Sequence, residues 1–156
     1  MSFLRETISV AALLAAYGVA QAALGARELE AVAPTTQLPA LPLSSRLAAG
    51  GLVLMLAAYA TLGRLIARSG AAARAAVAAG AAAGAFAGLI AGIAQATLQA
   101  DFFRDVLLWS SLSDAYLVFV IAALLVVEPL AGAVFGAVAS WLGYVLFRPA
   151  RRTESA

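Results

Sequence analysis

The sequence predicts an all-α integral membrane protein, a four-helix bundle in a single transmembrane domain that covers residues 1–156. Two observations carry this prediction. Hydrophobic residues make up 64% of the 156 residues and charged residues only 12%, and the mean hydropathy is +0.97. The apolar residues also fall into four runs near the ~20 residues that a helix needs to cross a bilayer. This charge-poor composition leaves no room for a separate aqueous domain.

The first two spans are predicted over residues 8–24 and 47–66, with charged residues at their ends. Three prolines between positions 34 and 42 predict an extended loop over 33–45, because proline interrupts helices. The second span ends at an arginine-rich turn that contains Ser69 and Gly70.

The first run also fits a secretory signal peptide. Residues 8–19 are typical of its apolar region, and Ala20, Gln21 and Ala22 match the small-residue cleavage pattern. Such a match arises easily in an alanine-rich chain. We therefore favour an uncleaved first helix, and cleavage would leave the other spans in the same orientation.

The third span is predicted over residues 75–98 and the fourth over 115–147. Between them, aromatic and aliphatic residues in the polar segment 99–114 predict a short interfacial helix. The fourth run is too long for one upright helix, and Pro129 within it predicts a kink. The alternative is a five-span protein in which residues 105–127 and 130–147 cross separately.

The distribution of arginine predicts the orientation, because short cytoplasmic loops carry an excess of positive charge. With four spans and both termini in the cytoplasm, the inner side holds seven arginines and the outer side three. The outer three are Arg27, Arg46 and Arg104, and the inner seven are Arg5, Arg64, Arg68, Arg74, Arg148, Arg151 and Arg152.

Small residues recur at helical spacing in the last two spans and predict close helix packing. Glycine allows two helix backbones to approach closely, which favours association in lipid. Packing within the chain is the favoured interpretation, with self-association next and a substrate path last. The stripe of the third span, a glycine zipper, consists of Gly80, Gly84, Gly88 and Gly92, and that of the fourth consists of Gly132, Gly136, Ser140 and Gly143.

Glu128 shares the stripe of the fourth span and is the candidate proton site. Burying an ionised carboxylate in a bilayer costs at least about 2.5 kcal/mol, so intramembrane acids are often functional. Gln95 and Gln99 continue the glycine stripe of the third span and are candidate polar neighbours. The competing interpretation is a neutral Glu128 that is hydrogen-bonded within the bundle. A straight fourth helix places it near the bilayer middle, whereas a sharp bend at Pro129 places it near the outer surface.

The chain lacks histidine, cysteine, lysine and asparagine. We therefore predict no catalytic, cofactor or metal site, because the commonest transition-metal ligands and general bases are missing. No phosphate loop or nucleic-acid surface is present, so no nucleic-acid partner is expected. Abundant alanine and glycine without lysine or asparagine indicate a bacterial genome rich in G and C.

These patterns favour a non-enzymatic membrane protein that serves as a small assembly or accessory subunit. Its expected surroundings are the lipid bilayer of the bacterial cytoplasmic membrane, with a homo-oligomer or a larger membrane complex as partner. The alternative function is a proton-linked carrier or channel for a small molecule or ion that uses Glu128.

Overall fold

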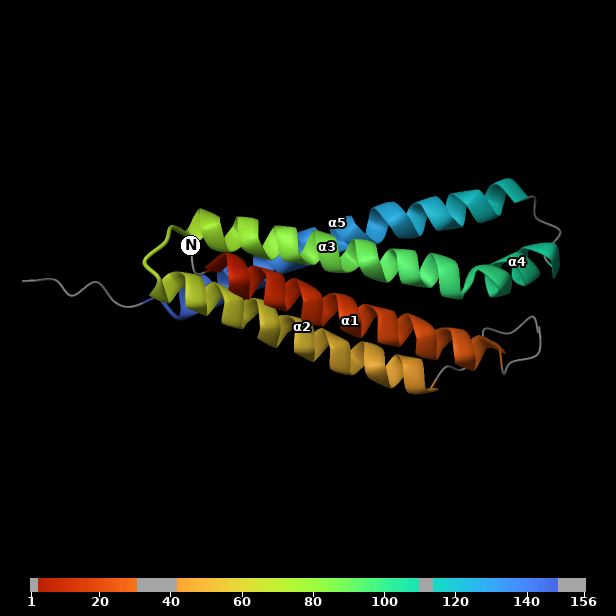
Figure 1. Cartoon of the computed structure of the whole chain (residues 1–156), viewed down its shortest axis with the longest axis horizontal. Helices are drawn as coiled ribbons and strands as arrows, with labels where there is room; N and C mark the ends of the chain where they lie inside the picture. Colours follow the sequence, from red (N-terminus) through yellow and green to blue (C-terminus); the bar gives the residue numbers. More distant parts are fainter. Residues whose placement is uncertain (1–2, 31–41, 110–113, 149–156) are drawn as a thin grey trace, which may run out of the picture.

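The computed structural model describes residues 3–30, 42–109 and 114–148 and confirms the all-α fold. Four long helices alternate in direction along one axis, and one short helix lies at one end of the bundle (Figure 1). No described residue belongs to a strand. In chain order the helices are α1 (Phe3–Glu30), α2 (Pro42–Arg68), α3 (Ala73–Leu98), α4 (Ala100–Trp109) and α5 (Asp114–Leu146).

Four of these helices are long and apolar enough to cross a membrane, which makes the chain a multi-pass membrane protein. The spans are Phe3–Leu29, Ser45–Arg68, Ala73–Leu98 and Ala115–Leu146. The first two are longer than predicted, because charged side chains at helix ends reach water without stopping the helix. The predicted loop over 33–45 is also too long: α2 already begins at Pro42, and proline fits the first turn of a helix. The rest of that loop, residues 33–41, lies outside the described residues.

The last apolar run forms a single membrane helix, whereas the five-span alternative requires two. α5 is continuous from Asp114 to Leu146 with Pro129 inside it, so the five-span alternative is wrong. It follows the long axis of the bundle from one end to the other (Figure 1). Proline leaves the carbonyl of Leu125 without its usual helical donor, a defect that membrane helices tolerate. The kink at Pro129 stays a prediction.

The turn between α2 and α3 depends on Gly70. Its φ is +76°, in the left-handed region that glycine adopts freely, and this conformation ends α2. The Ser69 hydroxyl donates to the carbonyl of Ile66 at 2.8 Å, and the Gly70 amide donates to the carbonyl of Ala67 at 3.2 Å. The arginine-rich turn predicted from the sequence is therefore a tight helix-to-helix connection.

Helices α2 and α3 each pack against both α1 and α5, which places α1 and α5 diagonally across the bundle. Two clusters of buried side chains fill the space between them. One surrounds Tyr59 with alanines of α1, α3 and α5, and the other surrounds Leu62, Ile66 and Tyr144. The Tyr144 hydroxyl donates to the carbonyl of Ala71 at 3.0 Å and so ties α5 to the turn before α3.

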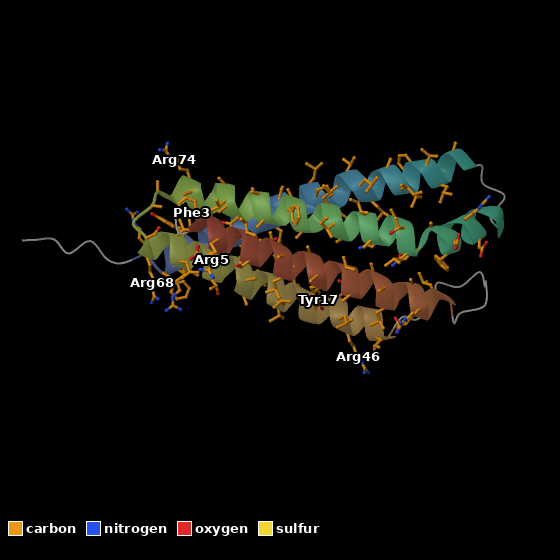
Figure 2. All side chains as sticks on the ribbon, in the orientation of Figure 1. Phe3, Arg5, Tyr17, Arg46, Arg68 and Arg74 are labelled. Carbon is orange, nitrogen blue, oxygen red and sulfur yellow. The ribbon has the colours of Figure 1, made fainter. Side chains whose placement is uncertain are left out.

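One end of the bundle collects most of the positive charge. Here α1 and α3 begin and α2 and α5 end, and Figure 2 shows Arg5, Arg68 and Arg74 together at this end, with Arg46 well away along α2. We call it the arginine end, defined by Arg5, Arg64, Arg68, Arg74 and Arg148, and we call the opposite end, where α4 lies, the far end. The first described residues of α1 and the last of α5 therefore lie at the same end.

Candidate functional site

The glycine stripes of α3 and α5 lie against each other. A Cβ atom added at Gly84 would lie 1.9 Å from the carbonyl oxygen of Gly132, and one added at Gly132 would lie 2.3 Å from that of Gly84. One turn away, a Cβ at Gly80 would lie 2.1 Å from the Gly136 oxygen, and one at Gly136 would lie 2.2 Å from the Gly80 oxygen. No side chain larger than hydrogen fits at these four positions. The two backbones are in direct contact along this line.

The contact continues toward the far end beside Glu128. A Cβ at Gly88 would lie 2.3 Å from the Glu128 carbonyl oxygen, and one at Gly92 would lie 2.8 Å from the Leu124 oxygen. All four predicted glycines of α3 therefore face α5. Backbone contact of this kind maximises dispersion forces and brings Cα–H groups close to carbonyl oxygens, which stabilises helix pairs in lipid.

Toward the arginine end the same face of α5 also packs against α2. A Cβ at Gly143 would lie 2.3 Å from the Ala60 oxygen, and one at Gly63 would lie 2.0 Å from the Ser140 oxygen. Ser140 is fully buried between α2 and α3, and its hydroxyl makes no hydrogen bond within the described part of the chain. The small residues of α5 thus pack against two helices: Gly132 and Gly136 against α3, and Gly143 against α2 near the arginine end.

The Glu128 side chain is half-buried near the middle of α5, about 21 Å along the axis from Asp114. Side chains of a helix tilt toward its N-terminus, so that of Glu128 leans toward the far end and past Gly92. The Cβ of Glu128 is 3.4 Å from the position that a Gly92 Cβ would occupy. Among the described residues the carboxylate accepts no hydrogen bond. Tyr17 and Tyr59, tyrosines of α1 and α2 that could have bonded it, do not, and the Tyr17 hydroxyl donates to Leu47 instead.

The two candidate glutamines do not join Glu128 through a described hydrogen bond. Gln99 caps the end of α3, and its side-chain amide donates to the carbonyl of Ala22 on α1 at 3.4 Å. Gln95 is half-buried one turn earlier, and its backbone carbonyl accepts the amide of Gln99. The polar group at the end of α3 therefore links α3 to α1.

The contact between α1 and α2 was not identified from the sequence. The Tyr17 hydroxyl donates to the carbonyl of Leu47, and its ring lies over Gly51, where an added Cβ would come within 2.5 Å of the ring. One tyrosine facing the adjacent glycines Gly50 and Gly51 has no helical periodicity. The sequence indicates this contact only through a tyrosine and a glycine that lie at similar depth in neighbouring spans.

Glu6 was also missed as a buried polar residue. It lies in the first turn of α1, and its Oε2 is buried without a hydrogen bond to any described residue. Phe3 and Val10, one turn away on either side, pack against the cluster around Leu62 and Ile66. In the sequence Glu6 is one of the charged residues that precede the first apolar run, and nothing in that pattern indicates a buried side chain.

The most apolar stretch of α5 is the least buried of the four membrane-spanning stretches. In α5 no residue of the most apolar 18-residue stretch is buried, whereas 44% of the corresponding stretch of α3 is buried. Several large side chains of α5 are more than half exposed, namely Tyr116, Val118, Phe119, Val126, Val127, Leu130 and Val134.

In residues 3–30, 42–109 and 114–148, no three acidic side chains lie close enough together to hold a metal ion. Comparison with protein-family models, with curated proteins and with solved structures found no match. Any assignment of function therefore depends on the geometry of the bundle itself.

Proposed function

We propose that the protein is a non-enzymatic assembly or accessory subunit of the bacterial cytoplasmic membrane, with both termini and the arginine end in the cytoplasm. In this proposal α3 acts as a glycine-zipper helix that holds α5 in place. The partner is a second copy of the chain or a larger membrane protein.

The observation that carries the proposal is the exposed outer face of α5. Its backbone is fixed against α3 by the contacts at Gly84 and Gly132, while its large aliphatic side chains point away from the bundle. A rigid helix that presents valine and leucine is suited to contact lipid or a further transmembrane helix. Association of a preformed face costs less conformational entropy than association of a mobile one.

Site-specific photo-crosslinking tests this proposal. A photoreactive phenylalanine analogue replaces Val127 or Val134 on α5, and matched controls carry it at Val53 on α2 or Leu13 on α1, which are also exposed. We expect one discrete adduct from the α5 positions in intact membranes, with the mass of a dimer or of one defined partner. Equal adducts from all four positions, or none from α5, would contradict the proposal.

A proton-linked carrier is the second candidate, and one observation favours it. Glu128 is an ionisable group within a membrane-spanning helix, and no described residue hydrogen-bonds its carboxylate. The test is proton uptake into liposomes that contain the purified protein, under an imposed membrane potential. The carrier predicts uptake that Glu128→Gln abolishes while Gln95→Leu and Gln99→Leu weaken it. The accessory subunit predicts no uptake by any of these proteins.

A further inference from the structure

We propose that α2 and α5 form a binding site for an anionic phospholipid at the arginine end, with Arg64 and Arg68 holding the headgroup phosphate. The two arginines are one helical turn apart on α2, so their guanidinium groups can reach the same phosphate. Arginine binds phosphate through two parallel hydrogen bonds, which makes it the preferred residue for this group.

The contact between α2 and α5 positions the first of these arginines. The Arg64 guanidinium carbon lies 4.9 Å from the centre of the Phe147 ring, at the end of α5. A cation over an aromatic face is held in place while its N–H groups in the guanidinium plane stay available. Arg148 follows Phe147 directly and is exposed, so it adds positive charge to the same corner.

The described protein supplies no negative charge that neutralises these groups. Neither Arg64, which is half-buried, nor Arg68, which is exposed, forms an ion pair within the described part of the chain. Glu6 is the acidic residue that the structure describes at this end, and its Oε2 is buried without a hydrogen-bond partner among the described residues. The uncompensated charge fits an external anion.

The neighbouring surface fits acyl chains. Leu146 of α5 is 74% exposed, and Leu142 lies one turn below it with 44% exposed. On α2, Thr61, Ala57 and Val53 continue the line of the arginines toward the far end at steps of three and four, and all three are exposed. Charged residues followed by small and aliphatic ones reproduce the order of a phospholipid from headgroup to tail. This order distinguishes a lipid site from a site for free phosphate.

Lipid binding by the purified protein tests the inference. The probes are phosphatidylglycerol, phosphatidylcholine and inorganic phosphate, added to the protein in a mild detergent. The readouts are the melting temperature and the number of lipids retained in native mass spectrometry. Arg64→Gln, Arg68→Gln and the double variant are each compared with the control Arg46→Gln. Arg46 is exposed and lies near the other end of α2. The pair Arg64→Lys and Arg68→Lys keeps the charge and removes the planar guanidinium groups.

We expect phosphatidylglycerol to raise the melting temperature of the natural protein and of Arg46→Gln, with phosphatidylcholine and phosphate having no effect. Each Gln substitution at Arg64 or Arg68 should weaken binding about fivefold, and both together about thirtyfold. The lysine pair should bind between these limits. Equal binding of both lipids, an unchanged affinity of the double Gln variant, or an equal effect of phosphate alone would overturn the inference. If the double Gln variant fails to fold, the single variants decide by the same criteria.

Discussion

Replacing Gly84 by alanine is the sharpest perturbation of the contact between α3 and α5. The added Cβ would lie 1.9 Å from the oxygen and 2.5 Å from the carbon of the Gly132 carbonyl, where ordinary contact requires 3.4 Å or more. The shortfall of about 1.5 Å falls on backbone atoms. A backbone carbonyl cannot rotate away as a side chain can, so α3 and α5 must separate along this line.

The expected cost is near the upper end of the about 1–3 kcal/mol that overpacking a close-packed interior costs. Gly50→Ala provides the matched control, because it lies in α2 and its added Cβ would meet nothing closer than the Tyr17 hydroxyl at 3.9 Å. Both substitutions gain about 1 kcal/mol of helix propensity. The difference between them therefore isolates the clash, and we expect it to be about 3 kcal/mol.

Reversible unfolding in mixed micelles, followed by tryptophan fluorescence and circular dichroism, measures this difference as a free energy of unfolding. Size-exclusion chromatography of both variants shows whether the oligomer distribution changes as well. If Gly84→Ala proves as stable as Gly50→Ala, with an unchanged size, α3 and α5 are not in backbone contact and the reasoning fails.

Three further substitutions test other contacts by the same unfolding assay. Gly51→Ala should weaken the contact between α1 and α2, because its Cβ would come within 2.5 Å of the Tyr17 ring. The loss of stability should be smaller than for Gly84→Ala, since the tyrosine side chain can shift, and an equal loss would contradict this ranking. Tyr144→Phe should cost about 1 kcal/mol through loss of the hydrogen bond to the carbonyl of Ala71, and unchanged stability would argue against that bond. Glu128→Leu should preserve or raise the stability, because no described residue bonds the carboxylate and an apolar side chain suits the bilayer; a clear loss would reveal a polar partner for Glu128.

The number and order of the membrane helices were predictable from the sequence because apolar length and charge position dominate in a bilayer. Helix boundaries were less predictable. Pro42 was expected within a loop and instead begins α2, since a proline that breaks a helix interior is accepted in its first turn. The sequence also left open whether Pro129 divides the last span, because proline in membrane helices is tolerated where neighbouring helices support the backbone.

The spacing of glycines predicted a packing face but not its register. Nothing in the sequence specifies that Gly84 lies opposite Gly132 rather than one turn away, because each step of four residues presents another glycine. Gly63 was not identified, since it lies twelve residues after Gly51 in α2 and continues no stripe of glycines at steps of three or four. Gln99 was grouped with Glu128 because it shares the angular position of Gly92, yet its long side chain reaches α1 instead.

The four-span path of the chain is the claim on which the proposals depend, and cysteine accessibility tests it most directly. The chain contains no cysteine, so each introduced thiol is the only one present. The variants are Leu4→Cys, Ser69→Cys and Arg148→Cys at the arginine end and Ala115→Cys at the far end, all at exposed positions. Intact cells are treated with a maleimide that cannot cross the membrane. The account predicts labelling of Ala115→Cys alone, with the other three labelled only after the cells are opened. Labelling of Arg148→Cys and Ala115→Cys from the same side would contradict it, because α5 would then not cross the membrane once.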